Sequence, residues 1–183
     1  LQEEDTETAR KLTSDLNRIE EYVEMVLTFL RLDSDSNDYL IREYDLDGII
    51  RTSVRKFSRE FILKKLTLDY KPVNYTVLTD EKWLTFVIEQ IISNAVKYTT
   101  EGSVRIYMNE QGILCIEDTG IGISAEDLPR IFENGYTGFN GREDKRASGI
   151  GLYLCKRITE NLGHTISAES QPGKGTKIIL DLR

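Results

Sequence analysis

Hydrophobic residues in the first 32 positions recur in alternating steps of four and three residues. The repeating positions are Leu12, Leu16, Ile19, Val23, Val26 and Leu30. This spacing predicts one helix over residues 5–32, with a narrow apolar seam along one side. Because one narrow seam does not stabilise a helix of this length alone, we expect it to pair with other helices in a dimeric bundle. Packing of this helix against its own domain is the alternative.

Polar residues 33–38 predict a linker, and the hydrophobic pattern changes beyond it. Strands are expected at residues 39–46, 66–70, 75–78, 103–118 (a hairpin turning at 109–112), 164–170 and 176–183. Helices are expected from an Asp45 cap through Phe61, from an Asp80 cap through Tyr98, at 124–132 after a Ser124 capping box, and from 149 to a stop at Gly163. This order predicts an α+β domain over residues 39–183, a two-layer α/β sandwich with helices on one face of a mixed sheet.

Composition narrows the classes of function that the chain can have. A net charge of −7 over 183 residues argues against general nucleic-acid binding, which needs a basic surface. No run approaches the roughly 20 apolar residues of a membrane span. His164 is the only histidine, which argues against a multi-histidine metal site or a Ser-His-Asp triad. Cys115 and Cys155 lack the CxxC spacing of metal or redox sites, so we expect buried, unpaired thiols.

Four polar side chains gather along one side of the helix that follows Asp80. They are Gln90, Asn94, Lys97 and Tyr98. A buried amide such as that of Asn94 is costly without a partner. Its oxygen suits Mg²⁺, which usually also binds phosphate oxygens, and a lysine one turn later can meet a phosphate. The tyrosine ring can stack on a base, so this face is either a nucleotide site or a plain polar border.

The stretch EDTGIGI, residues 117–123, is a second candidate. Asp118 ends a predicted strand, and its carboxylate can accept a hydrogen bond from an exocyclic amine such as that of adenine. Gly120 and Gly122 allow the backbone to approach a ring closely. An ordinary Asp-Thr-Gly turn is the alternative interpretation.

Two glycine-bearing junctions follow. In ASGIGLYL, residues 147–154, small residues precede a helix, so backbone N–H groups and the helix dipole favour a bound anion such as phosphate. It is not a Rossmann fingerprint, because Leu154 replaces the last glycine, and a tight loop-to-helix junction is the alternative. PGKGT, residues 172–176, fails as a P-loop because Ala168 replaces the first glycine and a strand follows. As a hairpin turn it can still border a site through Gly175 and Thr176.

Taken in order, these motifs resemble those of a known family. NAVKYT, DTGIGI, IFENGYTG, SGIGLYL and GKGT are similar to the N, G1, F, G2 and G3 boxes of the Bergerat-fold ATP-binding domain of sensor histidine kinases. The resemblance covers residues 39–183, and the seam helix resembles the second helix of the dimerisation and phosphoacceptor hairpin. More narrowly, EYDLDGII, LTDEKWLTFVIEQIISNAVKYT and GYTGFNGR resemble bacitracin-sensing membrane kinases that pair with ABC transporters of antimicrobial-peptide resistance.

The resemblance implies a role for each matching residue. Asn94 would ligate a Mg²⁺ that bridges the ATP phosphates, and Gln90 would help to orient the attacking group. Asp118 would bind the adenine amine. The remaining residues that it assigns to the ATP site are Lys97, Tyr98, Gly120, Gly122, Ile123, Phe132, Arg142, Ser148, Gly149, Ile150, Gly151, Leu152 and Thr176. Phe132 would anchor a lid at residues 134–148.

Two positions in the expected lid depart from the family pattern. Thr137 stands where many members carry an arginine, so Arg142 is the candidate to supply that charge. Ala147 replaces a frequent glycine. Both departures concern the lid and leave the core motifs intact.

The implied function is transfer of the γ-phosphate of Mg-ATP to a histidine elsewhere, and from there to an aspartate of a response regulator. His164 starts a predicted strand, so we expect it to have a packing or surface role and not to accept the phosphoryl group. Since the chain begins within a helical pattern and without methionine, we expect a fragment: the cytoplasmic part of a kinase anchored in the bacterial membrane that senses antimicrobial peptides or envelope stress.

The expected partners are its own phosphoacceptor helix, a second kinase subunit, a response regulator and an ABC transporter, with no nucleic acid. One alternative is a serine-directed kinase or an ATP-gated clamp of the same fold. Another is a non-catalytic interaction module whose nucleotide site has decayed.

Overall fold

The computed structural model describes residues 12–13, 16, 19–20, 23–28, 30, 32, 39–138 and 149–183. It divides into two compact units, Leu1–Asn37 and Asp38–Arg183. Every described residue between 12 and 32 is helical, as the seam predicts. The seam side chains are exposed, from 37% for Val26 to 65% for Leu16. Within the described residues, no helix combines the length and hydropathy needed to cross a membrane.

A five-stranded mixed sheet forms one layer of the second unit. Its strands lie in the order β2 (Thr67–Tyr70), β4 (Ser103–Met108), β5 (Leu114–Asp118), β7 (Gly175–Asp181) and β6 (Thr165–Gln171). Only the β2–β4 pairing is parallel. A separate antiparallel pair joins β1 (Arg42–Asp45) to β3 (Thr76–Thr79). The predicted strands and the mixed sheet are confirmed.

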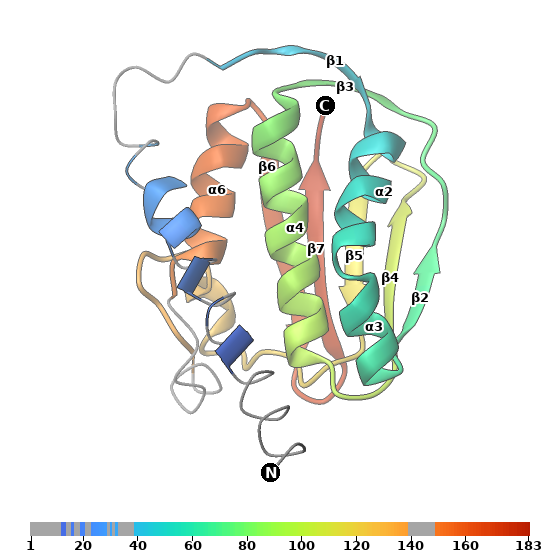
Figure 1. Ribbon diagram of the computed structural model, residues 1–183, viewed down its shortest axis with the longest axis vertical. Helices are drawn as coiled ribbons and strands as arrows, with labels where there is room; N and C mark the ends of the chain where they lie inside the picture. Colours follow the sequence, from blue (N-terminus) through green and yellow to red (C-terminus); the bar gives the residue numbers. More distant parts are fainter. Residues whose placement is uncertain are drawn as a thin grey trace. The chain divides into compact units, whose positions relative to one another are not determined.

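Helices form the second layer and cover one face of this sheet (Figure 1). They are α2 (Leu46–Lys56), α3 (Ser58–Lys64), α4 (Glu81–Tyr98) and α6 (Gly151–Asn161). Fully buried aliphatic side chains fill the space between the layers, among them Leu84, Ile88 and Ile91 of α4 and Ile106, Ile116 and Leu180 of the sheet. The predicted α+β sandwich, with helices on one face, is therefore confirmed.

The helix predicted from Asp45 through Phe61 is interrupted. Asp45 caps it as expected, accepting hydrogen bonds from the N–H groups of Asp47 and Gly48 at 3.2 Å. The chain leaves the α-helix at Phe57, where φ is −97° and ψ is 7°. The Ser58 hydroxyl donates to Arg55 O at 2.8 Å, a local bond that competes with the helical ladder. The prediction of one continuous helix was wrong, and α2 and α3 are separate.

The prediction of a helix at residues 124–132 is also wrong. Its N-terminal signal is real, because Ser124 Oγ accepts the Asp127 N–H at 3.1 Å. Only one 3-10 turn follows, Leu128–Arg130 (η1). Pro129 lies within that turn and has no N–H to continue a helical ladder.

Candidate functional site

The helix α4 is fixed at its start by a single carboxylate. Asp80 Oδ1 accepts the Trp83 N–H at 3.2 Å, which caps the helix as predicted. Asp80 Oδ2 accepts the Leu40 N–H at 2.8 Å, so the same side chain holds the segment that enters β1. The helix then runs 18 residues across the sheet and ends at Tyr98.

The four polar candidates on α4 are all half-buried. They are Gln90, Asn94, Lys97 and Tyr98. Lys97 Nζ lies 5.0 Å from the centre of the Tyr98 ring. A partly buried amide, an ammonium and a phenol ring therefore lie along the last three turns of α4, at the edge of its packed face.

Asp118 lies at the end of β5 and is 8% exposed. Its Oδ1 accepts the Gly120 N–H at 2.8 Å and the Thr176 N–H at 3.3 Å. Burial raises the pKa of the Asp118 carboxyl, while these two N–H groups and the nearby Thr99 hydroxyl oppose that shift. Thr99 Oγ1 is itself buried without a hydrogen-bond partner in the described part of the chain, so it lies near the carboxylate without bonding to it.

Two glycines allow three backbone segments to converge at Asp118. A Cβ on Gly120 would overlap the Tyr98 carbonyl oxygen at the end of α4. A Cβ on Gly175 would overlap the Asp118 carbonyl oxygen, and its φ of +94° also disfavours any side chain. The end of α4, the turn after β5 and the start of β7 can meet only because these positions lack side chains.

The helix α6 runs antiparallel to α4. The Cys155 thiol lies 3.9 Å from Val87 O, while Asn161 at the end of α6 bonds to Tyr39 near the start of β1. The first residue of α6, Gly151, therefore lies toward the Asn94 half of α4 (Figure 1). Ile150 occupies the N-cap position, and its own aliphatic side chain makes no capping hydrogen bond. Leu152 follows in its first turn and is half-buried.

A backbone hydrogen bond joins the described residues on either side of positions 139–148. The Gly135 N–H donates to Gly149 O at 3.1 Å, and Gly149 has a φ of +69°. Phe132 is half-buried just before this contact. Of the remaining candidates, Arg142 and Ser148 lie outside the described residues, as does most of the predicted lid.

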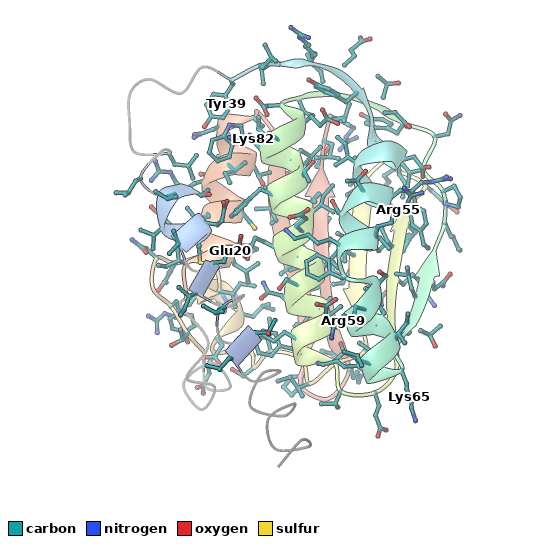
Figure 2. All side chains as sticks on the ribbon, in the orientation of Figure 1. Glu20, Tyr39, Arg55, Arg59, Lys65 and Lys82 are labelled. Carbon is teal, nitrogen blue, oxygen red and sulfur yellow. The ribbon has the colours of Figure 1, made fainter. Side chains whose placement is uncertain are left out.

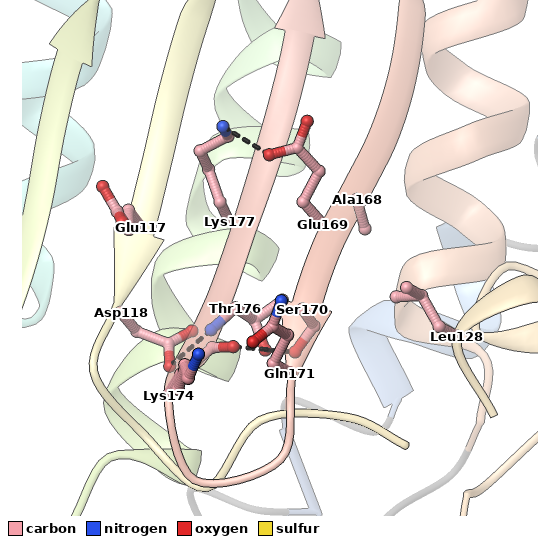
Figure 3. Close-up of a pocket in the computed structure, with 11 residues that line it drawn as sticks. Glu117, Asp118, Leu128, Ala168, Glu169, Ser170, Gln171, Lys174, Thr176 and Lys177 are labelled. Atoms are coloured by element: carbon pink, nitrogen blue, oxygen red, sulfur yellow. Dashed lines mark hydrogen bonds and ion pairs between the residues drawn. The ribbon is translucent and has the colours of Figure 1, made fainter. Parts of the chain in front are cut away.

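A cavity of about 450 Å³ opens beside Asp118, on the side of β6 and β7 (Figure 3). Asp118, Gly175 and Thr176 line it together with Leu128 of η1. Its lining comes from β5, the β6–β7 hairpin and η1, so it adjoins the Asp118 end of the candidate site and does not extend along α4.

Ser170 and Thr99 also belong to this arrangement, although neither is among the predicted site residues. Ser170 Oγ accepts the Ile123 N–H at 2.8 Å and donates to Gly175 O at 2.7 Å. It thereby joins the predicted Ile123 to the turn before β7. A serine in an alternating strand gives no sign of these contacts. Thr99, unlike Ser170, has a local sequence signal, because it directly follows the predicted site residue Tyr98.

Comparison with known proteins identifies the family. Residues 79–183 match the family described as histidine kinase-, DNA gyrase B-, and HSP90-like ATPases. The chain belongs to this ATPase family. ATP is thus the ligand class of the fold, and the matched range contains α4, Asp118 and the start of α6.

The relatives of this ATPase chain are sensor kinases. It is 35% identical to the sensor histidine kinase YxdK of Bacillus subtilis, over 97% of the chain and 57% of that protein. It is 36% identical to the sensor histidine kinase GraS of Staphylococcus haemolyticus, over 98% of the chain and 53% of that protein. The chain spans about half the length of these curated relatives. The predicted resemblance to sensor histidine kinases is confirmed.

Solved structures confirm the fold. The Acinetobacter baumannii histidine kinase AdeS superposes with a TM-score of 0.70 at 23% identity, over 95% of this chain and 83% of that one. At that identity the likeness concerns architecture, and it establishes the α+β sandwich as that of histidine-kinase catalytic domains.

Proposed function

We propose that this chain binds Mg-ATP and that the whole protein transfers the γ-phosphate to one of its own histidines, for relay to an aspartate of a response regulator. The observation that carries the proposal is the buried carboxylate of Asp118. Two backbone N–H groups hold its Oδ1 in place, and it lines a cavity together with residues of the β6–β7 hairpin.

The adenine end of the site follows from this carboxylate. The hydrogen bonds described for Asp118 fall on Oδ1, so Oδ2 is suited to accept the exocyclic amine of adenine. The buried Thr99 hydroxyl offers a second polar contact there. We assign Tyr98, Gly120, Gly122, Ile123 and Thr176 to the same adenine site, where the two glycines allow the backbone to pack closely around Asp118.

The phosphate end lies between α4 and the start of α6. The start of α6, from Gly149 to Leu152, suits a bound phosphate, because the positive end of the helix dipole lies there. Lys97 supplies a positive charge, and the Asn94 amide oxygen is the ligand for Mg²⁺. Mg²⁺, when bound, would neutralise phosphate charge. Gln90, one turn before Asn94, orients the attacking group.

Phosphoryl transfer depends mainly on positioning and charge neutralisation, so this site needs no covalent nucleophile of its own. We assign Phe132 as the anchor of the lid, and Arg142 and Ser148 as further phosphate-binding residues. His164 is 6% exposed and contacts Thr79 of β3, so we assign it a structural role and leave phosphoacceptance to a histidine elsewhere.

The exposed seam of the first unit supports a further part of the proposal. Its leucines and valines suit a helical bundle with the phosphoacceptor helix and a second subunit, which makes the whole kinase a homodimer. We also propose that the whole protein is anchored in the bacterial membrane with this part in the cytoplasm. There it senses antimicrobial peptides or envelope stress together with an ABC transporter.

Autophosphorylation of the full-length protein with γ-labelled ATP tests this function. A phosphoryl group on histidine is labile in acid and stable in base, whereas one on serine is stable in acid. We expect an acid-labile label in the unmodified protein. Label on serine, or ATP hydrolysis without any label on the protein, would instead assign a serine kinase or an ATP-gated clamp. The absence of both label and turnover would assign an interaction module.

Asn94→Asp provides the site-specific arm of that experiment. The substitution changes the proposed metal ligand, so we expect the label to fall at least tenfold, as is usual for loss of a positioned catalytic group (~10²). Asn74→Asp makes the same chemical change at an exposed position and is the matched control. Equal labelling of both variants would refute the role of Asn94.

A further inference from the structure

The last turn of α4 carries both nucleotide-site side chains and unsatisfied backbone. Carbonyl groups at a helix C-terminus have no partners within the helix and must find them elsewhere. In α4 these groups belong to residues 96–99, the same segment that carries Lys97 and Tyr98. How this turn is held therefore decides where those two side chains lie.

Lys64, the last residue of α3, supplies most of the missing partners. Its Nζ donates to Val96 O at 2.6 Å, to Lys97 O at 3.1 Å and to Thr99 O at 3.1 Å. An ammonium has three N–H donors, and here each one has an acceptor. A positive charge also interacts favourably with the negative end of the helix dipole.

Lys64 is an exposed residue, but two of its three ammonium bonds are shielded. The bonds to Val96 O and Thr99 O are partly buried, whereas the bond to Lys97 O is exposed. Burial lowers the pKa of Lys64. An exposed residue with partly buried ammonium bonds indicates that the Lys64 head group packs against the end of α4.

The fourth carbonyl of this turn is held from the opposite side. Tyr98 O accepts the Ile121 N–H at 3.2 Å, from the turn that follows Asp118. Gly120 approaches the same oxygen so closely that a Cβ would overlap it. The four consecutive carbonyls from Val96 to Thr99 are therefore all bonded, three to Lys64 and one to the Asp118 turn.

We propose that Lys64 is a positioning residue for the nucleotide site, which clamps the end of α4 against the Asp118 turn and so fixes Tyr98 and Lys97 relative to the adenine carboxylate. Lys64 itself does not touch the nucleotide. The inference rests on the proposed function, because it assigns Lys64 to the same ATP site.

Loss of the ammonium leaves three carbonyls of α4 without their partner. The end of the helix then frays, and the Tyr98–Ile121 bond, which joins it to the Asp118 turn, weakens with it. We expect Lys64→Met to weaken Mg-ATP binding by about fivefold, the size of a charge effect at a helix terminus. Lys64→Arg keeps the charge and several N–H donors, so it is expected to restore most of the affinity.

Lys65→Met is the matched control, because it removes the same charge one residue later. Lys65 is exposed and projects away from the fold at the end of α3 (Figure 2). Calorimetry with Mg-ATP gives the affinities of the four proteins below their unfolding temperatures. Amide hydrogen exchange gives a local readout: Lys64→Met should speed exchange at Thr99 and Ile121 while leaving Leu84, near the start of α4, unchanged.

Each outcome decides a separate claim. If the unmodified chain binds Mg-ATP and Lys64→Met binds it equally well, the inference is overturned and the proposed function stands. If Lys65→Met weakens binding as much as Lys64→Met does, the effect is one of net charge and the clamp is likewise overturned. No binding by the unmodified chain would overturn the proposed function itself and the inference with it. Should Lys64→Met not fold, Lys64→Gln, which retains two N–H donors, takes its place in the same comparison.

Discussion

The Thr176 N–H donates to Asp118 Oδ1 at 3.3 Å, although the two residues are 58 positions apart in the sequence. This bond joins the end of β5 to the start of β7. Together with the Gly120 N–H at 2.8 Å, it fixes the orientation of a carboxylate that burial makes costly to ionise. The fold thus holds a buried hydrogen-bond acceptor, the Asp118 carboxylate, in a fixed orientation at the candidate site.

Replacing Asp118 with asparagine should separate stability from binding. Burial raises the folded-state pKa above 3.8, so the protonated acid contributes stability that is lost as pH rises through the folded pKa. Asparagine keeps an oxygen for the Gly120 N–H and cannot ionise. We therefore expect Asp118→Asn to be at least as stable as the unmodified chain at pH 7 in urea unfolding. A clearly less stable variant would show that the charged carboxylate supports the fold.

Alanine at Gly175 should be far more damaging than alanine at Gly173. Gly175 begins β7 and Gly173 lies in the turn before it, and both have a positive φ, +94° and +75°. A left-handed conformation costs a non-glycine residue about 1–2 kcal/mol, and both variants carry that cost. Only at Gly175 does the new Cβ overlap the Asp118 carbonyl, whereas nothing lies within 4 Å of a Cβ at Gly173. We expect losses of more than about 3 kcal/mol for Gly175→Ala and about 1 kcal/mol for Gly173→Ala.

Chemical unfolding of both glycine variants checks that expectation. Equal losses at the two positions would mean that the convergence at Asp118 relaxes easily, and would remove the steric reason for glycine there.

His164 should make stability depend on pH. Its Nε2 lies 3.3 Å from Thr79 Oγ1, and its Nδ1 is buried without a partner among the residues that the structure describes. Burial lowers the pKa of His164, and Asp181 partly opposes this. Because the folded-state pKa lies below 6.5, the unfolded chain takes up the proton first, and stability falls as pH drops below 6.5.

His164→Gln removes that proton uptake. We expect its unfolding free energy to change less between pH 7.5 and pH 5.5 than that of the unmodified chain, as measured by urea denaturation at each pH. Parallel pH curves for the two proteins would assign the acid sensitivity to other groups.

A row of alternating charges should add modestly to sheet stability. Asp69, Arg105, Glu117, Lys177 and Glu169 lie directly opposite one another across the five strands. Lys177 Nζ lies 2.5 Å from Glu169 Oε2, and Arg105 bonds to Asp69 at 3.0 Å. Lys177→Glu places like charges opposite each other, so we expect a loss of about 1 kcal/mol that shrinks in high salt.

Lys71→Glu is the control for this row, since it makes the same change at an exposed position outside the sheet. Thermal unfolding at low and high ionic strength compares the two. If both variants lose the same stability and the loss does not depend on salt, the cross-strand pairing of these charges does not contribute to the stability of the sheet.

Local signals in the sequence predicted most of the elements correctly. Asp45 and Asp80 cap their helices with their own carboxylates, and Asn109 accepts the Gln111 and Ile113 N–H groups in the predicted hairpin turn. These contacts span a few residues, so residue type and spacing determine them. The break at Phe57 was missed because the apolar period continues unchanged through it.

The candidate site shows the same contrast between residues with a local sequence signal and residues without one. Asp118 and Asn94 are predicted site residues because each sits in a motif of its own; the structure places Asp118 at the end of β5 and Asn94 one turn before the end of α4. Lys64 and Ser170 were not, because their partners come from strands and helices that only the tertiary fold brings together. No spacing rule connects residues that are 47 positions apart, as Ser170 and Ile123 are.

The most direct test of the account is calorimetry with Mg-ATP and Mg-GTP, for this chain and for Asp118→Asn. Adenine presents an amine where guanine presents a carbonyl oxygen, so a carboxylate acceptor should bind the first and repel the second. We expect ATP to bind at least about tenfold more tightly than GTP, and this preference to disappear in Asp118→Asn. Equal affinity for the two nucleotides, or an ATP preference that survives the substitution, would contradict the assignment of Asp118 as the adenine-binding residue.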